Sequence, residues 1–285
     1  MHQFPIGVMM EAFRTDTRQA IEQAARLGVK GMQMDAAKGE HAPEHMTKEA
    51  RRELLDRMHS NGLVFSALCG DLGKGFGNPE LNPALIEQSK RILDLAKELG
   101  TDIVTTHIGV VPADKTHPRY QIMQDACGEL SRYADSLGAH FAIETGPEVS
   151  IVLKDFLDSL DSKGVAVNLD PANLAMVTGD DPVQAVYNLK DYIVHTHAKD
   201  GIKLRENNPE LVYGIIKGEA PQERGFQEVS LGKGEVPFAE YLAALEDIDY
   251  GGFLTIERKV GDNPAGEIAL AIDFLQNHMK IRDKE

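Results

Sequence analysis

Short apolar runs alternate with amphipathic helical patterns along the whole chain. Eight runs have the length and composition of buried strands: PIGVMM (5–10), GMQMDA (31–36), LVFSALC (63–69), DIVTTHI (102–108), HFAIET (140–145), GVAVNLD (164–170), DYIVHTH (191–197) and GFLTIE (252–257). Between the runs, segments such as 16–28 and 84–100 repeat apolar residues at helical spacing. In the second segment Ile86, Ile92, Leu93 and Leu99 fall near one face. The pattern therefore predicts strands and helices in alternation.

The boundaries between these elements support the same interpretation. A glycine ends a helical segment just before a strand at Gly28, Gly62, Gly100 and Gly138, which is typical of helix C-caps. Strands that alternate with helices imply a parallel sheet. Eight such units in 285 residues predict a closed (β/α)₈ barrel, a TIM barrel of the α/β class, as a single domain over residues 1–285.

An open, doubly wound sheet is the structural competitor of the barrel. Such a sheet would carry a phosphate-binding glycine fingerprint after an early strand. The stretch CGDLGKGFG (69–77) is rich in glycine, but it has neither dinucleotide-binding nor P-loop spacing. We therefore favour the closed barrel.

One segment interrupts the alternation. Residues 198–235 separate the seventh predicted strand from the next predicted helix, PFAEYLAALEDI (237–248). A connection of this length in a compact domain usually has a function. It would lie over the C-terminal mouth of the barrel and could act as a lid over an active site. A mobile surface insertion is the alternative interpretation.

The composition argues against a nucleic acid or a membrane as the binding partner. The net charge is −15, from 30 basic and 45 acidic residues, whereas a nucleic-acid-binding protein normally presents a basic face. Two cysteines, Cys69 and Cys127, are too few for a disulfide framework. The sequence shows no signal peptide and no apolar stretch of about 18 residues. We expect a cytoplasmic protein with no membrane or nucleic-acid partner, and a homo-oligomer is compatible with the sequence.

Four of the predicted strands end in a residue that is costly to bury. Glu144, Asp170, His197 and Glu257 end the fifth, sixth, seventh and eighth runs. Barrel enzymes carry their active sites at the C-terminal strand ends, and neighbouring strands lie about 4.8 Å apart. The four side chains can therefore converge on one point.

Three carboxylates in so small a space need a neutralising cation. Three oxygen donors and one imidazole suit a single divalent ion, with Mn²⁺ as the first expectation and Mg²⁺, Co²⁺ or Zn²⁺ as alternatives. Three carboxylates and a dication leave one negative charge, which a protein or substrate group must offset. Each residue alone would more often cap a strand or bond to a neighbour, but four on consecutive strands favour a metal site.

At these positions the sequence resembles the xylose-isomerase-like superfamily of sugar and sugar-phosphate isomerases and epimerases. The resemblance covers essentially the whole chain and is carried by AIETG around Glu144, NLDPANL around Asp170, HTHAKD around His197, and LTIER with GDNP around Glu257. The segment FQEVSLGKGEVPF (226–238) also fits the family pattern. The resemblance implies that the second histidine of the H-x-H pair binds metal, so that His197 rather than His195 is the ligand.

The resemblance also implies a reaction. The metal would bind a carbonyl oxygen and a neighbouring hydroxyl of a keto sugar, and Glu144 and Glu257 would be the catalytic residues that remove and return a proton. Epimerisation or aldose–ketose isomerisation would follow, and loss of a β-hydroxyl would give dehydration, as in inosose dehydratases. Abasic-site endonucleases share the barrel but hold three metals with extra histidines. The matching positions here read ALCGD, Asn173 and FQEVS, which opposes that function.

Five further residues are candidates for substrate binding: His107, Lys199, Asn173, Glu148 and Arg258. His107 ends the fourth strand, and Lys199 lies two positions after His197; for each, a structural bond or a solvated side chain is the alternative. Asn173 stands where epimerases of this superfamily often carry a histidine, so their substrate contacts do not transfer directly. Strand alternation favours an outward direction for Arg258.

His195 and His197 face the same side of their strand because they lie two positions apart. Only His197 is near the predicted mouth, so we expect His195 to be packed inside the barrel.

Overall fold

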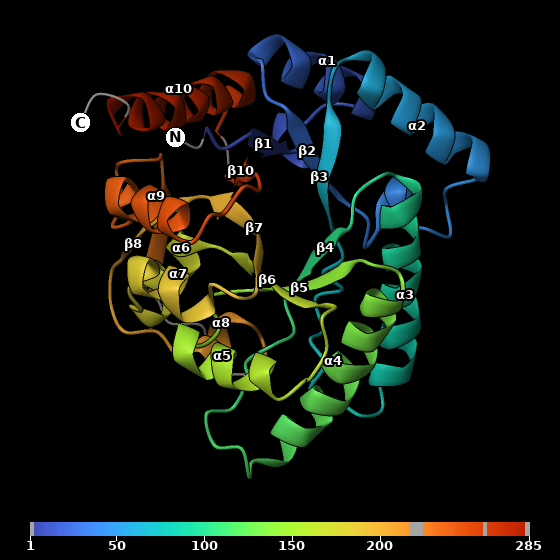
Figure 1. Ribbon diagram of the computed structural model, residues 1–285, viewed down its shortest axis with the longest axis vertical. Coiled ribbons are helices and arrows are strands. Elements are labelled where there is room, and N and C mark those ends of the chain that lie inside the picture. Colours follow the sequence, from blue (N-terminus) through green and yellow to red (C-terminus); the bar gives the residue numbers. More distant parts are fainter. Residues whose placement is uncertain (1–2, 217–224, 259–260, 283–285) are drawn as a thin grey trace.

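Eight parallel strands close into a barrel in the computed structural model, which describes residues 3–216, 225–258 and 261–282 (Figure 1). The order around the barrel is β1-β10-β7-β6-β5-β4-β3-β2, and every pairing between neighbours is parallel. The closed barrel confirms the predicted fold class. The strands are β1 (Ile6–Met9), β2 (Gly31–Asp35), β3 (Val64–Cys69), β4 (Ile103–Thr106), β5 (His140–Glu144), β6 (Val165–Leu169), β7 (Ile193–Ala198) and β10 (Leu254–Ile256).

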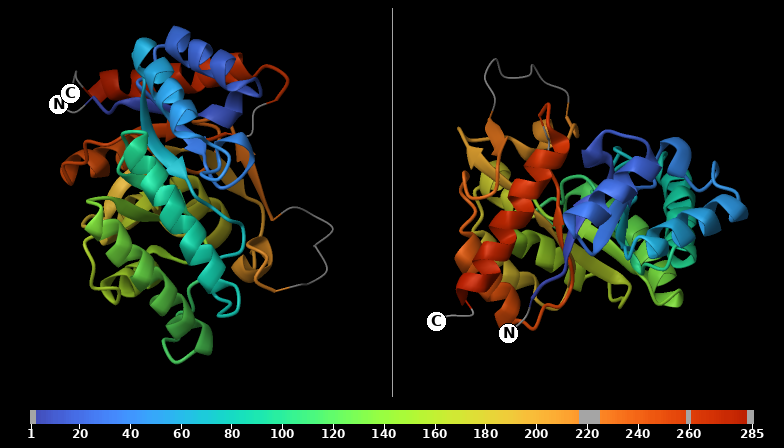
Figure 2. Two further views of the ribbon diagram at one scale, coloured as in Figure 1. Left: turned by 90° about the vertical axis from the view of Figure 1, so that its right-hand side faces the viewer. Right: turned by 90° about the horizontal axis from the view of Figure 1, so that it is seen from above.

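An outer layer of helices covers the barrel (Figures 1 and 2). None of the helices in the described ranges is long and apolar enough to cross a membrane. The main helices are α1 (Thr17–Leu27), α2 (Lys48–Ser60), α3 (Asn82–Glu98), α4 (Pro118–Ser136), α5 (Ser150–Asp158), α7 (Pro182–Leu189), α9 (Phe238–Asp247) and α10 (Pro264–Arg282). Short turns complete the layer: η1 (Met10–Phe13), η2 (Gly39–His41), α6 (Pro171–Asn173) and the π-helical turn η3 (Leu174–Thr178).

The helix boundaries follow the predicted signals. Asp16 caps α1 by accepting a hydrogen bond from the Gln19 backbone N–H, and Gly28 ends the helix in the left-handed region with φ 79°. Gly62, Gly100 and Gly138 also have positive φ, as the C-cap interpretation requires. The predicted helices at 16–28, 84–100 and 237–248 correspond to α1, α3 and α9.

Most strands are shorter than their apolar runs. β4 ends at Thr106, so His107 begins the following loop, whereas the run predicted a strand to residue 108. Ile108 in that loop is only 1% exposed. The apolar pattern therefore continues past the end of the hydrogen-bonded ladder because the loops at the barrel mouth are themselves buried.

The long segment at 198–235 has secondary structure of its own, which its sequence pattern does not reveal. β8 (Asp200–Lys203) and β9 (Phe226–Val229) form a separate antiparallel sheet, and the short helix α8 (Pro209–Val212) lies between them. We call residues 198–235 the insertion; its residues 217–224 lie outside the described residues. Figure 2 shows its described residues on one side of the barrel.

A buried aspartate fixes the base of the insertion. Asp200 Oδ2 accepts the backbone N–H groups of Gly232 and Gly234, and Asp200 Oδ1 accepts that of Val236. A Cβ on Gly234 would lie 2.1 Å from Asp200 Oδ1, so only glycine allows this close approach. These hydrogen bonds connect the segment just before α9 to the residue that begins β8, close to the end of β7.

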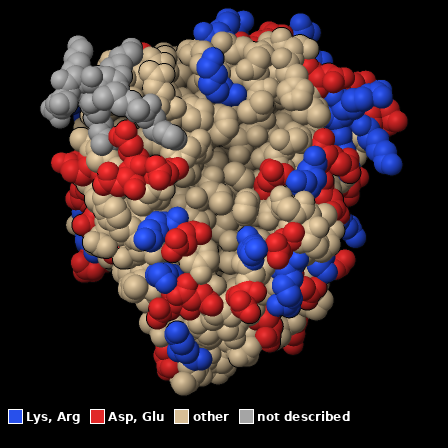
Figure 3. All heavy atoms as spheres, in the orientation of Figure 1, with Lys and Arg blue, Asp and Glu red and all other residues tan. Residues whose placement is uncertain are grey.

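Charged side chains of both signs are mixed over the face seen in Figure 3. Acidic and basic groups alternate around its edges, and no continuous basic area is visible on this face.

Candidate metal centre

The barrel brings the four predicted ligands together. Glu144 is the last residue of β5, Asp170 follows β6, His197 is the penultimate residue of β7, and Glu257 follows β10. These strands are neighbours in the barrel. One ligand atom from each residue lies within 4.8 Å of the other three. His197 Nδ1 is 3.1 Å from Glu257 Oε2 and 3.6 Å from both Glu144 Oε1 and Asp170 Oδ2.

These residues fit a single divalent ion. Bonds of about 2.1 Å on opposite sides of an ion separate two ligand atoms by about 4 Å, close to the spread seen here. Asp170 Oδ1 accepts the Asn173 backbone N–H, whereas Oδ2 is buried, accepts no hydrogen bond and lies 3.3 Å from Lys199 Nζ. Buried carboxylate oxygens need compensating groups, and a cation would provide one at Oδ2 in addition to Lys199.

Gln33, which the sequence analysis missed, orients the imidazole of His197. Gln33 donates its amide N–H to Thr105 Oγ1 at 3.0 Å, so its Oε1 faces His197 Nε2, also at 3.0 Å. His197 then donates from Nε2, and its Nδ1 faces the carboxylates. Burial lowers the pKa of His197, but Glu144 and Glu257 outweigh it and hold this pKa well above its ordinary value, whereas a bound ion would take the Nδ1 lone pair in place of the proton. A partner of this kind fixes the tautomer of a metal-binding histidine. A polar residue inside the apolar run of β2 was the available signal.

Asn168, also missed, supports Glu144 from inside the barrel. It donates from Nδ2 to Glu144 Oε2 at 3.1 Å and accepts at Oδ1 from His195 Nδ1 at 2.8 Å. His195 Nε2 in turn accepts from Thr255 Oγ1. Burial and the neighbouring His197 lower the pKa of His195 well below its ordinary value, so this ring stays neutral. His195 is fully buried below the ligands, which confirms its predicted packed position. Asn168 could have been found because it lies two positions before Asp170 and so faces the same side.

Lys199 places a positive charge among the carboxylates. Its Nζ lies 3.3 Å from Asp170 Oδ2, 3.0 Å from Glu257 Oε2 and 3.3 Å from Asn173 Oδ1, and the residue is 9% exposed. Burial opposes the charged form, but Asp170 and Glu257 hold the pKa of Lys199 well above its ordinary value. Burial also acts to raise the pKa of Glu257, but Lys199 and His197 hold it well below its usual range. Lys199 is therefore the protein group that offsets the excess negative charge.

Two more predicted residues surround Glu144. His107 Nε2 lies 3.5 Å from Glu144 Oε1, and His107 Nδ1 lies 3.3 Å from Asp71 Oδ2. Burial lowers the pKa of His107, but Glu144 and Asp71 outweigh it and raise this pKa to about 9. Asn173 donates from Nδ2 to Glu144 Oε1 at 3.0 Å. The sequence analysis did not identify Asp71.

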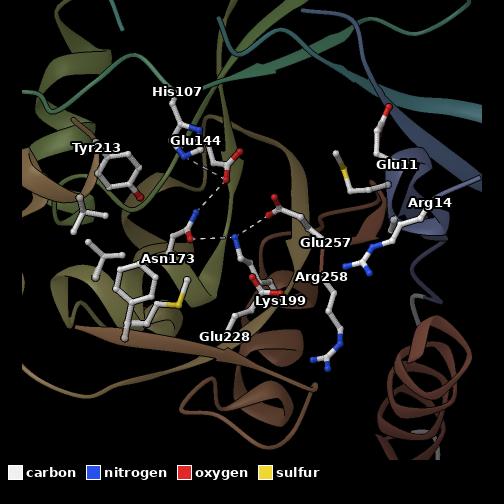
Figure 4. Close-up of a pocket in the computed structure, with 16 residues that line it drawn as sticks. Glu11, Arg14, His107, Glu144, Asn173, Lys199, Tyr213, Glu228, Glu257 and Arg258 are labelled. Atoms are coloured by element: carbon white, nitrogen blue, oxygen red, sulfur yellow. Dashed lines mark hydrogen bonds and ion pairs between the residues drawn. The ribbon is translucent and has the colours of Figure 1, made fainter. Parts of the chain in front are cut away.

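A cavity of about 450 Å³ opens above the ligands (Figure 4). Glu144, Glu257 and Lys199 lie at its polar end, and the insertion contributes much of its wall. Its apolar lining comes from Met9, Ala12, Met176, Val177, Val212, Tyr213 and Phe226. The remaining polar and charged lining residues are Glu11, Arg14, His107, Asn173, Glu228 and Arg258.

The last two predicted substrate residues lie differently. Arg258 lines the cavity and donates from Nε and Nη2 to Glu267 Oε2 at 2.9 and 2.6 Å. Figure 4 shows its guanidinium directed away from Glu257. Glu148 is buried, accepts the Val111 backbone N–H at Oε2, and is not among the residues that line the cavity.

Known proteins share this sequence pattern. The sequence model of a family described as xylose isomerase-like TIM barrel matches residues 21–278. An uncharacterized protein of Methanocaldococcus jannaschii is 24% identical over 222 residues, which cover 73% of this chain and 67% of that relative.

Solved structures share the fold. A xylose isomerase domain protein from Planctomyces limnophilus superposes with a TM-score of 0.80 and 25% identity, covering 98% of both chains. A probable 3-DHS dehydratase from Bacillus anthracis gives a TM-score of 0.75 and 19% identity, covering 96% of this chain and 99% of its own. A D-psicose 3-epimerase from Clostridium cellulolyticum H10 gives 0.73 and 16%, with coverage of 96% and 99%.

Proposed function

The chain belongs to the xylose isomerase-like TIM barrel family, and we propose that it is a divalent-metal-dependent isomerase or epimerase of a keto sugar or sugar derivative. The observation that carries this proposal is the convergence of Glu144, Asp170, His197 and Glu257 within 4.8 Å at the floor of a cavity. Mn²⁺ is the ion we expect first, because three oxygen donors and one imidazole suit it.

The four ligands would hold the ion, and Gln33 and Asn168 would keep His197 and Glu144 in place. When bound, the ion would supply positive charge that stabilises negative charge developing on two adjacent substrate oxygens. This contribution would make removal of a proton from the hydroxyl-bearing carbon next to the carbonyl feasible near neutral pH.

Glu144 and Glu257 are the groups we propose for the proton transfers. Figure 4 shows both carboxylates directed into the same space, and both line the cavity. Hydrogen bonds from Asn168 and Asn173 fix Glu144, whereas Glu257 is about one-third exposed and contacts Lys199. One carboxylate would accept the proton from carbon and the other would deliver a proton, which is the pairing that acid–base catalysis requires.

The path of the returning proton decides the product. Return to the opposite face of the same carbon gives an epimer, and return to the adjacent carbon gives an aldose–ketose pair. Loss of a hydroxyl from the next carbon would give dehydration, the reaction we keep as the second candidate. Lys199 and His107 favour this alternative, because both are cationic groups at the cavity from which a departing oxygen could accept a hydrogen bond.

Solvent-deuterium exchange tests the proposed function. The Mn²⁺-loaded protein is incubated in D₂O with a panel of keto sugars, their phosphates and inososes, and products are examined by NMR and mass spectrometry. We expect deuterium at a carbon next to the carbonyl of at least one member. Hydrolysis of an abasic-site DNA duplex without exchange into any sugar would contradict the proposal.

A further inference from the structure

Tyr213 places a hydroxyl in the cavity that forms no hydrogen bond with any described residue. The residue directly follows α8 in the insertion and lines the cavity. Figure 4 shows its hydroxyl directed toward Glu144 and Asn173. Within the described parts of the chain this hydroxyl has no hydrogen-bond partner, whereas the Tyr187 and Tyr192 hydroxyls bond to Asp247 and Asp158. A phenol in a largely apolar wall that lacks a partner is suited to bond a ligand.

The surrounding backbone makes room for this hydroxyl. Gly146, just beyond β5, has φ +130°, a conformation that other residues rarely adopt. A Cβ at this position would lie 2.8 Å from Tyr213 Oη and 2.4 Å from Asn173 Cβ. The Tyr213 ring also lies against the His107 ring, with centroids 5.3 Å apart. Tyr213 therefore lies close to His107 and Asn173, and both of these residues contact Glu144.

Contacts elsewhere fix α8 against the barrel. Glu210 in α8 forms an ion pair with Arg119 at the start of α4. On the other side of Tyr213, the Ile215 side chain packs over Gly109, where a Cβ would lie 3.2 Å from Ile215 Cδ1. The position of Tyr213 is thus set by contacts on both sides of it along the chain.

We infer that Tyr213 is a substrate-positioning residue that donates a hydrogen bond from its hydroxyl to one hydroxyl of a sugar lying above the four ligands. This inference rests on the proposed function and extends it, because it assigns the insertion a direct part in recognising the substrate. Tyr213 then selects sugars that carry the matching hydroxyl, since an analogue without it leaves the phenol unpaired.

The test compares Tyr213→Phe with the unaltered protein, both loaded with Mn²⁺. Dissociation constants are measured by calorimetry for D-tagatose, D-psicose and D-fructose and for the monodeoxy counterparts of each. One neutral hydrogen bond corresponds to an affinity change of about 3- to 10-fold. We expect Tyr213→Phe to weaken binding of a parent sugar by that factor and to leave unchanged the binding of the one deoxy analogue that lacks the partner hydroxyl.

Two further measurements separate this role from a structural one. The thermal midpoint of the sugar-free protein should not fall in Tyr213→Phe, because the phenol hydroxyl forms no hydrogen bond with the described residues. Tyr187→Phe, which removes a surface hydroxyl that bonds Asp247, is the matched control and should leave every sugar affinity unchanged.

Equal weakening of all sugars and deoxy analogues in Tyr213→Phe, or no weakening at all, would overturn the inference. Solvent-deuterium exchange by the unaltered protein is scored separately. Absence of exchange contradicts the proposed function, whereas unchanged discrimination between parent and deoxy sugars contradicts only the role of Tyr213.

Discussion

Replacement of Lys199 by Met should strengthen the binding of a divalent ion. The ammonium group lies 3.3 Å from Asp170 Oδ2 and 3.0 Å from Glu257 Oε2, two of the predicted ligand oxygens. In the metal-free protein the lysine therefore lies close to the expected ion position and already neutralises part of the negative charge that would attract an ion. Methionine keeps the length and apolar stem of the side chain and removes only the charge.

The magnitude follows from the charges and their environment. Two unit charges about 4 Å apart interact by about 4 kcal/mol at an effective dielectric constant of about 20. Lys199 is 9% exposed, but the Glu257 side chain is 32% exposed, so solvent screens part of the interaction. We expect that at least a third remains, about 1.4 kcal/mol, which corresponds to a tenfold rise in affinity for Mn²⁺.

The same variant should be less stable when no metal is present. Asp170 is fully buried, and removal of its cationic partner leaves an uncompensated charge, which typically costs about 3–5 kcal/mol. For a protein of this size that cost lowers the thermal midpoint by at least about 6 °C. Saturating Mn²⁺ should recover most of the loss, because ligand binding stabilises the folded state.

Calorimetric titration with MnCl₂ and thermal unfolding in EDTA measure the two effects. Lys203→Met is the matched control, because Lys203 lies in β8 and forms its ion pair with the exposed Glu206. It should change neither quantity. If Lys199→Met binds Mn²⁺ with unchanged or weaker affinity, the ion does not bind beside this lysine, and the assignment of the ligands is wrong.

Three other predictions concern the residues around the ligands. Glu144→Gln and Glu257→Gln should each lower the rate of solvent-deuterium exchange by at least about 100-fold while circular dichroism shows an unchanged fold; an active variant would remove that glutamate from the mechanism. Gln33→Leu should weaken Mn²⁺ binding about 10- to 100-fold in calorimetry, because His197 loses the partner that fixes its tautomer; equal affinity would show that this contact is dispensable. Burial raises the pKa of Glu148 from 4.5 to about 8, so the folded state retains a proton that the unfolded state loses. Stability should therefore fall as the pH rises through this window, by at most about 5 kcal/mol, and Glu148→Gln should flatten that decline in urea unfolding between pH 5 and pH 9.

The sequence was sufficient to predict the barrel and the convergence of four candidate ligands. Both follow from patterns that are local along the chain: a buried run and its last residue. Glu144, Asp170, His197 and Glu257 could be placed at one rim because parallel strands in a closed barrel all end on the same side. No knowledge of the pairing between particular strands was needed.

The residues that the sequence did not identify depend on strand register and on the path of the insertion. Gln33 reaches His197 because β2 and β7, which are not neighbours in the barrel, both direct side chains into its interior. The polar residue in the apolar run of β2 marks Gln33 as unusual, but the sequence does not show which residue it contacts. Tyr213 lies in a segment without strong periodicity, and its place at the cavity depends on the ion pair between Arg119 and Glu210. Contacts between segments so far apart in the chain cannot be found from apolar spacing.

The charges around the four candidate ligands determine what the other cavity residues can contribute to substrate binding. Three carboxylates carry three negative charges; a dication and Lys199 supply three positive ones, with His197 neutral when its Nδ1 lone pair faces the ion. The ligand cluster is then neutral without any contribution from the substrate. A charged group on the substrate is therefore not needed at the reacting carbons, and recognition there can depend on hydrogen bonds. A phenol without a protein partner, a lysine and an asparagine amide are groups that form such bonds with the hydroxyls of a neutral sugar. We therefore expect the reacting end of the substrate to be uncharged, as it is in a keto sugar.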